Sequence, residues 1–106
     1  MSYKFEESAE FIALFNGKYT CAKPSISIKT LKSHQVIHTN NSETKMDKYS
    51  LSHKQLLGAI NNSRKVRREE TILCATNCVF GGHLHEINIR MVKKNTKYVV
   101  IDIYIN

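Results

Sequence analysis

Residues 70–105 read ETILCATNCVFGGHLHEINIRMVKKNTKYVVIDIYI, and this stretch decides the predicted fold. Apolar residues recur at every second position through most of it, which is typical of strands with one buried face. Gly81-Gly82 matches a two-residue hairpin loop and sets a register in which Phe80 pairs with His83. Lys93-Lys94-Asn95 predicts a second turn, with the asparagine in the left-handed conformation. The stretch therefore predicts a three-stranded antiparallel meander.

Because side chains alternate between the two faces of a strand, the two-residue repeat also assigns each side chain to one face of this meander. The predicted buried face carries Ile72, Cys74, Thr76, Cys78, Phe80, Ile87, Ile89, Met91, Val99, Ile101, Ile103 and Ile105. The opposite face carries Asn77, Glu86, Asn88, Arg90, Tyr98, Asp102 and Tyr104. Because helices are expected on the apolar face, the polar and aromatic face stays open to solvent or to a ligand.

Two helices are predicted from apolar spacing and from their end signals. Residues 2–16 repeat apolar side chains at helical spacing and are followed by Gly17, a left-handed stop. Ser52 and Gln55 form a capping box at the start of a second helix. Leu51, the residue before the cap, can pack against Leu56 at the fourth helical position as a hydrophobic staple. Asn61-Asn62 is predicted to end this helix.

The remaining central segment is predicted to contain little regular structure. Residues 25–29 alternate as a short strand, which continues toward Val36 and Ile37 after a polar interruption. Residues 39–47 are polar and are expected to form an exposed loop.

The predicted fold class is α+β, with two helices packed on one face of an antiparallel sheet whose C-terminal part is the meander. Residues 1–106 are expected to form a single globular domain.

Charge is the most informative bulk property of the 106-residue chain, which has a net charge of +7 and a pI near 9.5. Residues 18–68 carry eleven bases against two acids, whereas residues 69–106 carry four of each. The excess favours a polyanionic partner. No apolar run approaches the roughly 18 residues that span a membrane, and the N-terminus lacks a secretory signal pattern, so a cytoplasmic protein is expected with no membrane partner.

The leading functional prediction is a small nucleic-acid-binding protein that holds phosphates through its central basic segment. Four cations within residues 64–68 can each meet a phosphate, and tyrosines on the open sheet face can stack unpaired bases. RNA or another single-stranded nucleic acid is therefore favoured. The predicted binding residues are Arg64, Lys65, Arg67, Arg68, Lys54, Lys29, Lys32 and Tyr104.

A second hypothesis is a metal-independent endoribonuclease on the polar sheet face. Its chemistry needs a base, a cation for the developing phosphorane charge and an acid for the leaving oxygen. Glu86, Arg90 and Tyr98 supply these types, and His53 sits at a helix start where the dipole favours a neutral imidazole. The order of helix and meander is similar to that of small ribonucleases such as RelE-like toxins and colicin-type nuclease domains. Whether the protein is an enzyme stays open at this stage.

Other partners and ligands are also considered. An inhibitor or regulator of the kind found in phages would use the basic segment to dock on an acidic protein surface. The C-terminal strand is expected to be an exposed edge, which would favour a homodimer.

Cys78, His83 and His85 are three zinc-compatible residues, but buried thiols are the preferred interpretation, and neither a metal nor another cofactor is predicted.

Overall fold

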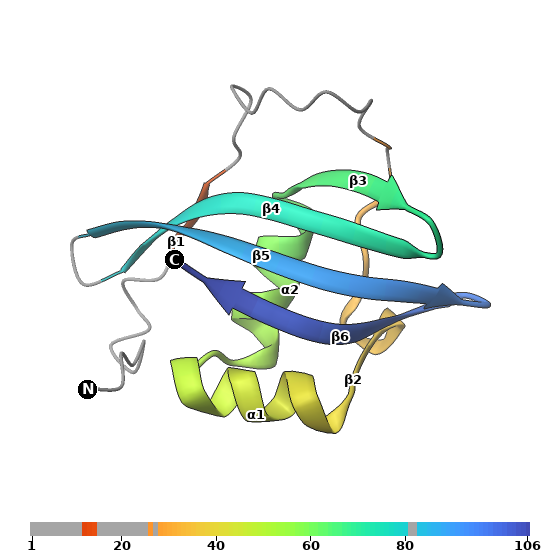
Figure 1. Ribbon diagram of the computed structural model, residues 1–106, viewed down its shortest axis with the longest axis horizontal. Helices are drawn as coiled ribbons and strands as arrows, with labels where there is room; N and C mark the ends of the chain where they lie inside the picture. The colour runs from red at the N-terminus through yellow and green to blue at the C-terminus, as the bar shows by residue number, and fades with distance from the viewer. Residues whose placement is uncertain (1–11, 15–25, 27, 81–82) are drawn as a thin grey trace.

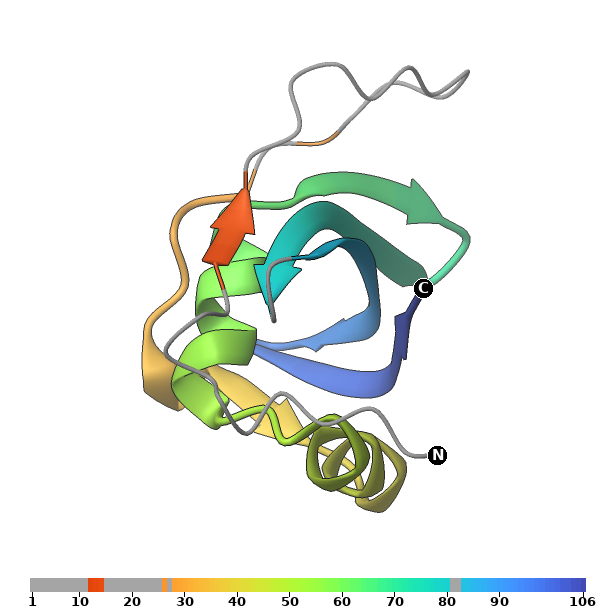
Figure 2. The ribbon, with the colours of Figure 1, turned by 90° about the vertical axis from the view of Figure 1, so that its left-hand side faces the viewer.

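The chain folds into a curved mixed sheet and two helices, as a computed structural model shows for residues 12–14, 26, 28–80 and 83–106. The sheet curls around one helix, and the other lies along a sheet edge (Figures 1 and 2). The α+β class is therefore confirmed. The sheet is mixed rather than antiparallel throughout, because one strand pair is parallel.

The strands and their order define the frame that positions every candidate site. They are β1 (Ile12–Leu14), β2 (Val36–His38), β3 (Arg64–Arg68), β4 (Thr71–Phe80), β5 (His83–Lys94) and β6 (Lys97–Ile105). The order across the sheet is β1-β4-β5-β6-β2, and β3 also pairs with β4. β1 and β3 pair with different stretches of β4, whereas β2 runs parallel to β6 at the far side.

The predicted register of the first hairpin is confirmed. Phe80 pairs with His83 and Cys78 with His85, as a two-residue loop at positions 81–82 requires. The conformation of these two loop residues lies outside the described part of the chain. On the inner face, toward the helix, Ile72, Cys74, Thr76, Cys78, Ile87, Ile89 and Met91 are all buried as predicted.

A β-bulge corrects the predicted faces of the last strand. Arg90 pairs with Asp102 but Met91 pairs with Val100, so Ile101 is an extra residue on β6. Because a strand alternates its faces with a period of two, one extra residue exchanges the faces on its N-terminal side. Tyr98 and Val100 therefore point inward, and the prediction that Tyr98 lies on the open face is wrong: it is only 7% exposed.

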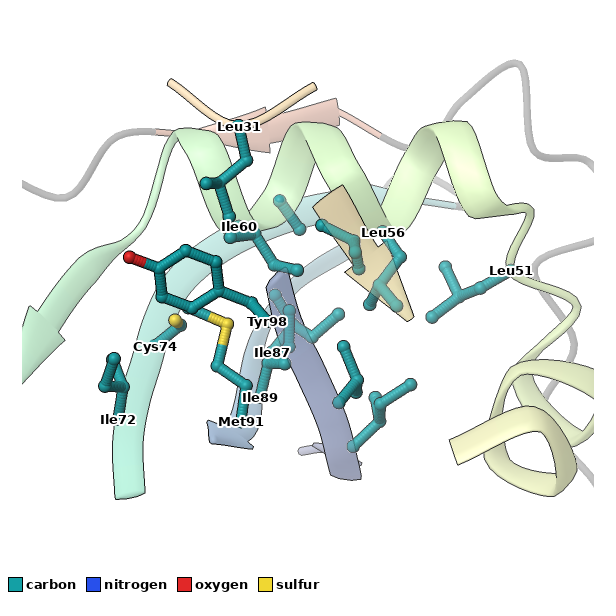
Figure 3. Packing of buried hydrophobic residues seen from close by; sticks show 14 of the residues in the cluster. Leu31, Leu51, Leu56, Ile60, Ile72, Cys74, Ile87, Ile89, Met91 and Tyr98 are labelled. Carbon is teal, nitrogen blue, oxygen red and sulfur yellow. The ribbon is translucent and has the colours of Figure 1, made fainter. Parts of the chain in front are cut away.

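Helix α2 (His53–Asn61) is the predicted second helix and forms the centre of the core. The Ser52 side chain accepts a hydrogen bond from the Gln55 backbone N–H, and the Gln55 side chain accepts one from Ser52, so the capping box is confirmed. Leu56 and Ile60 are fully buried among the inward side chains of the sheet (Figure 3). Close packing does not require a glycine at position 58, because a Cβ there would have no neighbour within 4 Å among the described residues.

Helix α1 (Asn40–Tyr49) corrects the predicted loop at residues 39–47. Thr39 caps it: its Oγ1 accepts from the Ser42 N–H, and Ser42 Oγ accepts in return from the Thr39 N–H. This box uses serine where the usual pattern has Glu or Gln, so the helix start was not recognised. The helix is mostly exposed, and its largest buried side chain is Tyr49.

The N-terminal predictions fall mainly outside the described residues. The helix expected over residues 2–16 is wrong at Ile12–Leu14, which pairs as strand β1 with β4. The rest of that segment is not described. Of the strand predicted over residues 25–29, Ile26 forms an isolated bridge to Lys65, whereas residues 28–30 have no regular structure.

The C-terminal strand is not the exposed edge that was expected. β2 pairs with the first residues of β6, and α1 lies beside this strand (Figure 1). Asn41 Nδ2 donates to the Ile101 carbonyl at 2.8 Å, and Lys45 Nζ donates to the Ile103 carbonyl at 3.3 Å. Among the described residues, β6 therefore does not present the exposed edge that would favour a homodimer.

The turn between β5 and β6 yields a stability prediction. Asn95 has a φ of 59°, in the left-handed region, as expected from the sequence. The predicted three-residue loop over residues 93–95 is wrong, because Lys93 and Lys94 belong to β5 and the loop consists of Asn95 and Thr96. Asn95→Gly should leave the free energy of unfolding nearly unchanged, whereas Asn95→Val should lower it by about 1–2 kcal/mol because a β-branched side chain is strained there. Urea unfolding of the two variants measures the difference. Equal stability of Gly and Val at this position would contradict the assigned turn.

Candidate functional site

The basic run predicted to grip phosphates forms edge strand β3, so its cations divide between two faces of the sheet. Arg64 pairs with Ala75 and Arg68 with Thr71, which places both arginines on the outer face. Lys65 and Arg67 alternate with them and point to the inner face. The four cations therefore cannot act as one continuous row.

Lys65 is a buried structural residue. It is 7% exposed, and its Nζ donates to the Ser63 carbonyl at 3.1 Å. Burial lowers the pKa of this ammonium, and the nearby Cys74 thiol opposes the shift. The prediction that Lys65 contacts phosphate is therefore not supported, because its side chain is buried and its ammonium already bonds the Ser63 carbonyl.

A hollow of about 470 Å³ opens at the inner side of the sheet, where the helix no longer covers the strands. The segment of residues 28–35 forms one wall through residues 28–31 and Gln35, and Figure 1 shows this orange segment passing behind the meander from β3 toward the start of β6. The β5–β6 turn forms another wall. The apolar floor consists of Ile28 and Leu31 of this wall together with Ile26 and Tyr98, all of them part of the hydrophobic core or packed against it.

Three cations from three separate segments line this cationic hollow: Lys29, Arg67 and Lys93. Among the residues that the structure describes, no carboxylate lines the hollow and none of the three cations makes an ion pair. Lys93 Nζ lies 5.9 Å from the centre of the Tyr98 ring, a cation–π distance. The hollow therefore concentrates positive charge over an apolar floor, which favours an anion with an organic part.

Helix α2 holds the wall that carries Lys29. Asn61 Oδ1 accepts from the Leu31 N–H at 2.9 Å, and Asn61 Nδ2 donates to the Leu31 carbonyl at 3.1 Å. At the other end of the helix, His53 Nε2 bonds the Ser33 carbonyl at 3.0 Å. The wall is thus attached to both ends of a rigid element, which fixes the position of a segment with little secondary structure of its own.

A pair of imidazoles extends this attachment to β2. His53 Nδ1 lies 2.7 Å from His38 Nε2. Because the Ser33 carbonyl only accepts, His53 Nε2 carries a proton, and when both rings are neutral His53 Nδ1 accepts from His38 Nε2–H. His38 Nδ1 is then a buried acceptor without a partner in the described structure. Burial lowers the pKa of His38, the charge of His53 adds to the shift, and Glu43 opposes it.

The structure also shows where the residues predicted for ribonuclease chemistry lie. Glu86 and Arg90 are on the outer face, whereas Tyr98 is buried on the inner face and the half-buried His53 bonds His38 of β2 and the Ser33 carbonyl. Both nitrogens of His53 already have partners. The described contacts therefore do not bring these four side chains into one site.

The other predicted binding residues are dispersed. Lys32 and Lys54 are exposed and do not line the hollow, and Arg64 is half-buried. Tyr104 is 56% exposed on the outer face, as predicted. Lys93 also lines the hollow, although it is not among the binding residues predicted from the sequence. It lies at the predicted turn, but no short sequence pattern indicates that it faces Lys29 and Arg67.

The cysteine and histidine cluster forms no metal centre among the residues described. No group of three His, Cys, Asp or Glu side chains there is arranged to hold an ion. Cys74 and Cys78 are buried free thiols, and burial raises the pKa of each to about 11, which disfavours the thiolate that metals bind. Cys21 lies outside the described residues.

Comparison with known proteins adds no assignment. The chain matches no protein-family model, no curated protein and no solved structure. Within the described ranges, no helix is both long and apolar enough to cross a membrane.

The imidazole pair predicts a pH dependence of stability. The folded pKa of His38 lies below its ordinary 6.5, so the folded protein binds fewer protons than the unfolded chain. The stabilisation is present above about pH 6.5 and is lost as the pH falls toward the lower folded pKa. Urea unfolding between pH 7.5 and 5 should show this loss, and His38→Gln should reduce it. Exposed His34→Gln is the control; identical slopes in all three proteins would contradict the assignment.

Proposed function

We propose that the protein binds single-stranded nucleic acid, with RNA as the first ligand to test, by placing a phosphate in the cationic hollow. The observation that carries the proposal is the convergence of Lys29, Arg67 and Lys93 on one hollow that no carboxylate of the described residues lines. A phosphate accepts hydrogen bonds through several oxygens at once, so cations approaching from three directions suit it well.

The neutral groups of the hollow support the same ligand. Gln35, Asn95 and Thr96 also line it and supply amide and hydroxyl groups beside the cations. These groups suit the sugar hydroxyls and phosphate oxygens of a nucleotide, while the apolar floor suits the faces of its rings. An acidic protein would place carboxylates on the same cations but would make less use of the apolar floor.

The test is a binding titration with a labelled single-stranded oligonucleotide across a series of salt concentrations. Arg67→Gln should weaken binding at every salt concentration and reduce the slope of log affinity on log salt by about 0.7, the contribution of one phosphate contact on a single strand. Lys93→Gln should act in the same direction. A thermal melt of each variant confirms that it is folded.

Two matched variants serve as controls. Lys65→Met removes one positive charge from the same strand, but from a buried position, and Lys48→Gln removes one from the exposed surface of α1. Both should keep the wild-type affinity and salt slope. Equal loss in Lys65→Met and Arg67→Gln would mean that only net charge matters, and equal affinity for polyglutamate would contradict a nucleic-acid ligand.

A further inference from the structure

The outer face of the meander contains a second, smaller recess on the opposite side of the sheet from the cationic hollow. This outer cleft has a volume of about 190 Å³ and includes Leu73, Asn88, Arg90, Asp102 and Tyr104 in its lining. The strand pairing places these residues in two neighbouring cross-strand rows: Leu73, Arg90 and Asp102 in one, and Asn88 and Tyr104 in the next.

Arg90 is an available cation even though it sits directly opposite an acid. Asp102 Oδ1 accepts from the Ile103 N–H at 2.9 Å and from Asn41 Nδ2 at 3.1 Å, and it lies 3.4 Å from Lys45 Nζ. These contacts outweigh desolvation and lower the pKa of the Asp102 carboxyl. Helix α1 thus engages the acid, and the exposed Arg90 guanidinium has no hydrogen bond or ion pair with another residue in the described ranges.

Tyr104 supplies an aromatic surface beside this cation. It is diagonal to Arg90 across the β5–β6 pair and keeps 56% of its surface exposed. Diagonal neighbours on one sheet face lie about 7–8 Å apart, within reach of long and aromatic side chains. Leu73, half-buried and directly cross-strand from Arg90, provides an apolar contact on the other side.

The geometry points to the outer cleft as a subsite for one unpaired base, which stacks on Tyr104 while Arg90 meets an adjacent phosphate. This inference rests on the proposed function and narrows its ligand. A base inside a duplex has both faces covered by its neighbours, so the cleft selects single strands over duplexes. The positive charge of Arg90 complements the phosphate next to the inserted base.

The test compares a single-stranded oligonucleotide with an abasic strand of equal length and charge. Tyr104→Ala should lower the affinity for the base-containing strand about fivefold or more, the lower end of the loss of one base–aromatic stack, and should leave the abasic strand unaffected. Tyr104→Phe should retain binding because the ring remains. Leu84→Ala removes another exposed apolar side chain, further along the same face, and should change neither affinity.

The outcomes separate this inference from the proposed function. If Tyr104→Ala binds the base-containing strand as well as wild type, or loses affinity equally for the abasic strand, the base subsite is wrong. If Arg67→Gln still weakens binding in that case, the cationic hollow stands by itself. A wild-type protein that binds a duplex of the same sequence as tightly as the single strand would also overturn the subsite.

Discussion

The packing of α2 into the curved sheet is the constraint on which the rest of the structure depends. Leu56, Ala59 and Ile60 have no exposed surface, and each strand must turn its apolar side toward them. Burial of this kind is the main favourable contribution to folding. Once the inner face of β4 is set, the pairing register determines which side chains of β3, β5 and β6 face the helix and which face outward.

The same constraint distributes the positive charge. Strand alternation sends Lys65 into the core and Arg67 to the rim of the cationic hollow, while Arg64 and Arg68 take the outer face. A run of five residues that looks like one basic patch therefore contributes to two surfaces. The hollow depends equally on the wall at residues 28–35, which α2 holds through Asn61 and His53.

The parts of the fold that were predictable depend on local chemistry. The capping box at Ser52, the hairpin register around positions 81–82 and the left-handed Asn95 each follow from residues within a few positions of one another. The bulge at Ile101 was not predictable in this way, because an unbroken apolar alternation fits an undistorted strand equally well. Helix α1 was missed because its apolar face is small and its stability comes from capping and from contacts with β6.

The sequence by itself determined the meander, the second helix and the excess of cations in the middle of the chain, since turn chemistry, periodicity and charge are local properties. Only the tertiary structure decided that Tyr98 is buried, that Lys93 joins Lys29 and Arg67, and that Asp102 is engaged by α1 and leaves Arg90 available. These facts depend on segments distant in the chain, whose approach is set by packing around a shared core and not by any short pattern.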